Sequence, residues 1–274
     1  KKWGRSATVN AHNVFTHFPK EPDCPICQKG KAIKARCSRK SGDSEKPDSL
    51  PKPTAIGQMI SADHAIFNED FESRKHDTVA LVVQDAFTYG LQAYPAKRKT
   101  ADECYVAFRR FMGVGKEAGH CWSDGSEELK ASLNRLQWPH DSSTPNRPAT
   151  NGIIARAMQR TKEGTSVCLV QSGLDDQWWD LAMQWYCFLR NVVDELVLDT
   201  PPKDSTKTVA LSNELPGPVP SATAYKQRFQ ADFRGPIIPF GALVDVMPTL
   251  EVLERMPTFD GRSIPGVFLG YHLH

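Results

Sequence analysis

Three apolar runs follow one another early in the chain, and each has the length and the β-branched or aromatic content of a β-strand. They cover residues 59–67, 77–87 and 90–97. The next segment, residues 100–116, repeats its apolar side chains at helical spacing instead. This order of strand-like and helix-like periods predicts a layered α/β domain.

The same alternation continues farther along the chain. Residues 118–125 predict a short strand ending at Asp124, residues 126–137 a helix, and residues 151–163 another helix after a Pro-rich loop. The most regular helix is expected at 175–193, where one apolar stripe recurs every three or four residues. The stripe consists of Trp178, Leu181, Trp185, Phe188 and Val192. Two interpretations stay open for it, core packing and a dimer interface.

The composition predicts a soluble globular protein. With 274 residues, 40% of them hydrophobic and 24% charged, the chain can bury a core and still carry small flanking modules. The net charge of only +2 demands no polyanionic partner. Positive charge is local instead, because residues 28–54 carry eight Lys or Arg side chains. The Pro-bearing stretch 38–54 is expected to be a basic linker, which can follow a phosphate backbone or simply be a solvated tether.

The cysteines and the hydropathy of the chain indicate the cellular compartment in which it is expected. The seven cysteines are scattered, so a secreted disulfide framework is not indicated and a reducing, intracellular setting fits better. No apolar run approaches the roughly 20 residues of a membrane helix, and no signal peptide is visible. We expect no membrane association. Because the chain begins at Lys1, we also expect it to be part of a longer protein.

The first segment, residues 1–37, has the ligand types of a zinc site. His12 and His17 precede a C-x-x-C pair, Cys24 and Cys27, and imidazole and thiolate are the ligands that tetrahedral zinc prefers. So short a segment needs a metal to fold. The prolines around the cysteines favour a knuckle over a helix. A ligand set that uses Cys37, or histidines that are mere surface residues, remain alternatives.

Two aspartates are candidates for a second kind of metal site. Asp63 lies within the first strand-like run, and Asp124 follows the short fourth one. Carboxylate oxygens are the ligands of Mg²⁺ and Mn²⁺, and phosphoryl transfer on DNA uses two such ions. Farther along, the segment RPATNGIIARAM places Ala155 directly before Arg156.

Together these segments resemble the integrases of copia-type LTR retrotransposons, transposable elements whose integrases belong to the retroviral integrase superfamily. In that family the third motif is similar to P-x-x-N-G-x-x-E-R, so Ala155 occupies the position of the catalytic glutamate. The resemblance implies an RNase H-like core at 55–195, a mixed five-stranded sheet with helices on both faces. It also implies that Asp63 and Asp124 hold Mg²⁺ or Mn²⁺ for DNA integration, by 3′-end processing and strand transfer.

Because the third acid is missing, the sequence leaves two functions open. The chain is expected to bind DNA, namely element ends and target, through Asn151, Arg156 and Arg160, but to be inactive as a polynucleotidyl transferase because of Ala155. Glu163 is too far along its helix to substitute, and Asp85 is more readily explained as a turn cap. The alternative is a domesticated or decayed scaffold protein that binds DNA without catalysis. Whether the alanine is inherited or introduced stays open.

The resemblance extends to assembly and to the end of the chain. It implies a homo-oligomer that acts in the nucleus. Residues 196–220 are expected to be a Pro-rich linker, and residues 221–274 part of a small β-rich module with a PFG…FLGY pairing that the family also has. The four-ligand set of the first segment likewise resembles the His-His-Cys-Cys domain of integrases, although the histidines stand closer to the cysteines here.

Overall fold

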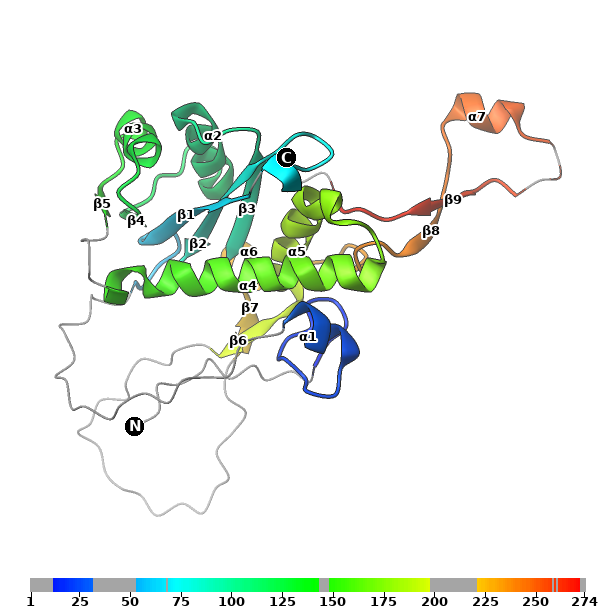
Figure 1. The fold of residues 1–274 in the computed structure, drawn as a ribbon, viewed down its shortest axis with the longest axis horizontal. Coiled ribbons are helices and arrows are strands. Elements are labelled where there is room, and N and C mark those ends of the chain that lie inside the picture. The colour runs from blue at the N-terminus through cyan, green and yellow to red at the C-terminus, as the bar shows by residue number, and fades with distance from the viewer. Residues whose placement is uncertain are drawn as a thin grey trace, which may run out of the picture.

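The computed structural model describes residues 12–31, 53–67, 69–142, 148–197, 221–257, 259 and 261–271. Five strands form one mixed sheet in the order β3-β2-β1-β4-β5 (Figure 1). They are β1 Ile60–Ile66, β2 Val79–Asp85, β3 Leu91–Ala96, β4 Cys121–Ser123 and β5 His140–Ser142. The β1–β2 and β2–β3 pairs are antiparallel, whereas β1–β4 and β4–β5 are parallel. This order and polarity make an RNase H-like sheet, and the predicted fold class is confirmed.

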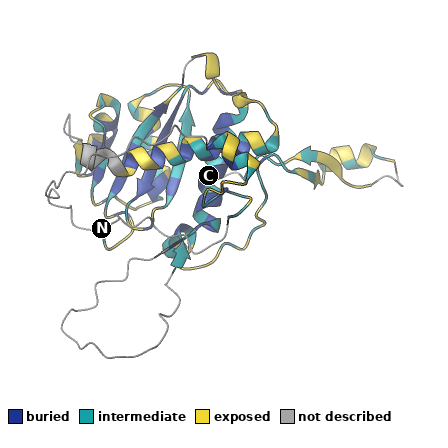
Figure 2. Cartoon of the chain, turned by 60° about the horizontal axis from the view of Figure 1, so that its bottom comes forward, coloured by how far each residue is buried: buried dark blue, intermediate teal, exposed yellow. Residues whose placement is uncertain are grey.

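Helices cover both faces of this sheet. Because side chains alternate along a strand, Leu81 and Val83 of β2 point to one face while Ala80 and Val82 point to the other. The first face packs against α2 (Ala101–Met112) and α3 (Glu127–Leu136), and the second against α4 (Pro148–Ser172) and α5 (Trp179–Val193). Figure 2 shows the buried strands between these helical layers. The sheet is therefore the centre of two hydrophobic clusters.

Helix α4 extends well beyond the predicted span of 151–163, through Ser172. Its second half is rich in β-branched residues and contains Gly164, which have low helix propensity. Tertiary packing overrides that preference. A Cβ on Gly164 would lie 2.1 Å from the ring of Tyr186, so the glycine lets α4 and α5 approach closely.

The apolar stripe of α5 is covered by the carboxy-terminal part of the same chain. Trp185 is 1% exposed, its ring stacks on Phe188, and its Nε1 donates a hydrogen bond to the Ile238 carbonyl at 2.9 Å. Phe268 and Tyr271 pack edge-on against the same indole. Core packing thus accounts for the centre of the stripe.

The PFG and FLGY segments pair with each other. Gly241 N donates to the Phe268 carbonyl at 2.8 Å, and Phe268 N donates to the Ala242 carbonyl at 2.9 Å. This pairing continues into a hairpin of β8 (Leu243–Val246) and β9 (Ile264–Val267). The hairpin, which carries α7 (Leu250–Arg255), projects from the body of the molecule (Figure 1).

The remaining elements are short. They are α1 Pro25–Gly30, η1 Glu69–Phe71, η2 Asp176–Trp178, the β6–β7 pair Glu195–Val197 and Ser221–Thr223, and α6 Ala224–Phe229. In the part of the chain that the structure describes, no helix has the length and apolarity to span a membrane. Most of the predicted linkers 38–54 and 196–220 lies outside the described residues.

Candidate metal centres

Asp63, within β1, and Asp124, directly after β4, occupy adjacent positions in the fold. The parallel register of β1 and β4 pairs Ala62 with Ser123, and each aspartate is the next residue along the chain. Burial raises the pKa of Asp63, and the negative charge of the nearby Asp124 raises it further. Each carboxylate keeps one oxygen on a backbone amide, from His64 at 2.8 Å and from Ser126 at 3.2 Å. The pair brings together carboxylate oxygens, the ligand type that divalent cations prefer.

Helix α4 packs on the sheet and carries Ala155 at an exposed position. Its neighbour Ile154 is buried in the same cluster as Ala65 of β1, whereas Ala155 is exposed. Lys162 lies about two turns later on the same face, and its charge helps to lower the pKa of Asp63 against the effect of burial. Lys162 is therefore close enough to Asp63 to act on its charge, and Ala155 lies on the same face of α4. A methyl group stands where the resemblance expects a carboxylate.

Neither Asp85 nor Glu163, the two other acids weighed from the sequence, replaces the missing one. Asp85 is 2% exposed and pairs in register with Ile60, the first residue of β1, whereas Asp63 pairs with Val82. Its oxygens accept hydrogen bonds from Gly57 N at 2.8 Å and from Thr88 N and Oγ1, both at 2.7 Å. Asp85 is the turn cap that the sequence favoured. Glu163 instead accepts a hydrogen bond from Gln159 on the exposed side of α4.

Three charged or polar side chains near the aspartates were missed by the sequence reasoning. Lys99, which precedes α2, lies 3.7 Å from Glu128 in the first turn of α3, and both charges act on His64. Burial first, and then Lys99, lowers the pKa of His64 to about 4, so its ring is neutral near pH 7. These side chains come from a strand, a helix and a loop and belong to no sequence motif, so only the fold brings them together.

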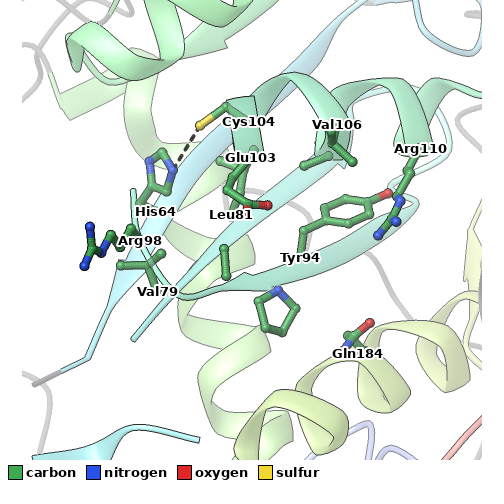
Figure 3. Close-up of a pocket in the computed structure, with 13 residues that line it drawn as sticks. His64, Val79, Leu81, Tyr94, Arg98, Glu103, Cys104, Val106, Arg110 and Gln184 are labelled. Carbon is green, nitrogen blue, oxygen red and sulfur yellow. Dashed lines mark hydrogen bonds between the residues drawn. The ribbon is translucent and has the colours of Figure 1, made fainter. Parts of the chain in front are cut away.

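A small pocket lies beside the aspartate site. In Figure 3 the His64 ring faces the thiol of Cys104, with Nε2 3.4 Å from Sγ, and the pocket continues toward Tyr94 and Arg110. Its volume of about 60 Å³ is far below the ~300 Å³ of small-molecule sites.

The second centre lies in the amino-terminal segment. Donor atoms of His12, His17, Cys24 and Cys27 all lie within 4.8 Å of one another. Among the described residues this is the one group of three or more His, Cys, Asp and Glu that can hold a metal ion. Cys37, the alternative ligand, lies outside the described residues. The predicted gathering of the four side chains is thus present.

The hydrogen bonds of the two histidines suit metal ligation. His12 Nδ1 lies 2.8 Å from the Pro19 carbonyl, to which it donates, so Nε2 is left as the ligand atom. His17 has its Nδ1 3.3 Å from Cys24 Sγ and a left-handed φ of 51°, a conformation that costs a non-glycine residue about 1 kcal/mol or more. Backbone amides, that of Cys27 first, lower the pKa of the Cys24 thiol. The donor set fits zinc.

One detail of the knuckle differs from expectation. A helical turn, α1, begins at Pro25, although the prolines favoured a knuckle without a helix. Proline is tolerated at the first position of a helix because its missing N–H has no partner there. The C-x-x-C pair therefore spans the start of a helix.

The three predicted DNA contacts have different surroundings. Arg156 is exposed, whereas burial first, and then Arg190, lowers the pKa of Arg160 to about 10. The guanidinium of Arg160 is surrounded by other groups of the same chain, namely Arg190, Asp194 and the buried Tyr186. The side chain of Asn151 lies outside the described residues. Of the two arginines, Arg156 is better placed for phosphates.

The sequence matches no known protein family and no curated protein. Solved structures with a similar fold include the BIV integrase catalytic core (14% identity, TM-score 0.37, 49% of this chain and 84% of that one). The HTLV-2 integrase core in complex with magnesium is another (16% identity, TM-score 0.40, 53% and 91%). A simian T-cell lymphotropic virus intasome in complex with PP2A regulatory subunit B56 gamma is a third (13% identity, TM-score 0.47, 89% and 76%). At these identities the likeness concerns the fold alone.

Proposed function

We propose that this chain is a copia-type integrase core that binds DNA but cannot join it, because Ala155 replaces the third catalytic carboxylate. The observation that carries the proposal is the juxtaposition of Asp63, within β1, and Asp124, directly after the parallel strand β4, with Lys162, about two turns after Ala155 on α4, close enough to act on Asp63. A sheet of this topology with two paired carboxylates suits hydrolysis or transfer of phosphodiesters.

The roles follow from the positions. Mg²⁺ or Mn²⁺ held by Asp63 and Asp124 would supply Lewis-acid activation of a phosphodiester. Arg156 and Lys162, both exposed on α4, would hold the DNA backbone near that site, and the small pocket at His64 leaves the surface open to a polymer. With two carboxylates only, one cation is bound weakly and a second has too few ligands. DNA ends and target DNA are the proposed partners, and a homo-oligomer at nuclear DNA is the proposed setting.

The amino-terminal centre has a structural role in this proposal. His12, His17, Cys24 and Cys27 would bind one Zn²⁺, since two imidazoles and two thiolates complete a tetrahedral set with no position left open. Such closed sites fold their segment rather than catalyse.

Restoring the acid tests the function. Purified protein and the variants Ala155→Glu and Ala155→Gln are compared for Mn²⁺-dependent joining of element-end DNA to a target plasmid. Ala155→Glu is expected to join DNA on the order of a thousandfold faster than the parent, and the neutral, equally long glutamine is not. Adding Asp63→Asn to Ala155→Glu should abolish the gain. Efficient joining by the unchanged chain would overturn the assignment of the site.

One result would favour the second candidate, a DNA-binding scaffold without catalysis. Ala155 itself is the observation on its side, because a scaffold has no need of the acid. If Ala155→Glu binds DNA as tightly as the parent and still joins none, the core has lost more than one carboxylate and the scaffold proposal is preferred.

A further inference from the structure

The loop between the two histidines of the amino-terminal centre docks on the core. Asn13 Nδ2 and Thr16 Oγ1 both donate to Asp194 Oδ1, at 3.1 and 2.6 Å. Asp194 directly follows the last residue of α5 as its C-terminal cap, and it is 2% exposed. The docking contact is therefore a buried, charge-assisted hydrogen-bond pair. It fixes the segment from His12 to His17 on the core.

Close packing accompanies this contact. A Cβ on Gly30, at the end of α1, would lie 2.7 Å from Val167 Cγ2 of α4, so the two helices touch there. Lys31 is 5% exposed and donates to the carbonyls of Thr16 and His17, at 3.2 and 2.9 Å. The loop that carries His17 is thus bound both by Asp194 of the core and by Lys31, which directly follows α1.

A side chain of the core, Gln171, also contacts one of the predicted metal ligands, His17. His17 Nδ1 faces Cys24 Sγ within the centre, while its other ring nitrogen, Nε2, lies 3.3 Å from Gln171 Oε1 on α4. Histidine bound to a metal through one nitrogen keeps a proton on the other, and a carbonyl-type oxygen that accepts this proton fixes the ring orientation. Gln171 stands where such an acceptor is needed, although it belongs to the core and lies far away in the sequence.

We propose that Gln171 is a positioning residue for the zinc centre, so that metal affinity depends on the docking of the segment against the core. This inference rests on the zinc assignment made above. Loss of such an acceptor typically lowers metal affinity by about 10- to 100-fold. A carboxylate at the same place accepts the proton more strongly than an amide does. Side-chain chemistry at position 171, rather than its volume, therefore sets the affinity.

The experiment measures Zn²⁺ affinity of the whole chain by competition with a chromophoric chelator at one pH. Gln171→Leu is expected to weaken zinc binding about 10- to 100-fold, and Gln171→Glu to bind at least as tightly as the parent. Gln159→Leu is the matched control, because it is the same exchange on α4 at an exposed position whose side chain donates a hydrogen bond to Glu163, and it should leave the zinc affinity unchanged. Circular dichroism of the zinc-free proteins checks that each variant is folded.

The outcomes separate the two proposals. If the parent chain binds no zinc, the zinc assignment fails and the positioning role fails with it. If the parent binds zinc but Gln171→Leu binds it equally well, only the positioning role is overturned. Equal weakening by leucine and by glutamate would also overturn it, since that result would come from packing and not from the hydrogen bond.

Discussion

Asp63, within β1, and Asp124, directly after the neighbouring parallel strand β4, lie close together, and burial and then the charge of Asp124 raise the pKa of Asp63. Placing two carboxylates side by side costs stability unless a cation or a proton reduces their repulsion. An arrangement that is costly for the empty fold is typical of a site built for a ligand. The measurable consequences concern pH, metal and DNA.

Asp63→Asn should stabilise the metal-free protein at neutral pH. The folded pKa of Asp63 lies above its unfolded value near 3.8, so the stability that protonated Asp63 contributes is fully present below that pH and is lost as pH rises through the folded pKa. The variant should therefore melt at a higher temperature than the parent at pH 7, and this difference in melting temperature should disappear below about pH 4.

Two comparisons make this test specific. The exposed Asp176→Asn should show no such difference. Added Mg²⁺ should raise the melting temperature of the parent and not that of Asp63→Asn, because a cation relieves the repulsion only where both carboxylates are present. A parent that is more stable than Asp63→Asn in metal-free buffer at pH 7 would contradict the account.

Removing zinc should weaken the core as well as the amino-terminal segment. Cys24→Ser, or a strong chelator, should release one Zn²⁺ per chain and lower the melting temperature of the core, since the docked loop supplies the hydrogen bonds of buried Asp194. Thr16→Val, which removes one of these bonds and no metal ligand, should cost about 1–3 kcal/mol of stability. A core that melts at one temperature with and without zinc would show that the two parts are independent.

The two arginines of α4 should respond differently to alanine substitution. Arg156→Ala should reduce duplex-DNA affinity and lower the steepness of its salt dependence by about one unit, because an exposed phosphate contact releases counterions. Arg160→Ala should mainly lower stability, because its guanidinium lies in the buried group with Arg190 and Asp194. Lys116→Ala, which removes an exposed charge elsewhere, is the control for net charge. Equal losses of affinity from Arg156→Ala and Lys116→Ala would argue against a specific contact.

Most elements of the core could be predicted from the sequence because their apolar periods are strong. Strand β5 was missed, since the polar HDS of 140–142 has no apolar run and is a strand only through pairing with β4. Helix α4 was predicted too short because the contact of Gly164 with Tyr186 is invisible to local propensity.

The site residues, too, could be predicted from the sequence only in part. The zinc ligands are close together in sequence, so their spacing was informative, and the turn-cap role of Asp85 followed from its place at a strand end. Lys99, Lys162 and Gln171 could not be predicted, because their roles depend on which loops and helices the fold places beside Asp63 and His17.

The central claim is that Ala155 leaves a two-carboxylate site where three are needed, and Mn²⁺ stoichiometry tests it most directly. Electron paramagnetic resonance counts free and bound Mn²⁺ during titration of the zinc-loaded parent, Ala155→Glu and Asp63→Asn. The account predicts one weak site in the parent, two spin-coupled ions in Ala155→Glu, and no site in Asp63→Asn. Two tightly bound, coupled ions in the unchanged parent would contradict it, because the site would then be complete without an acid at position 155.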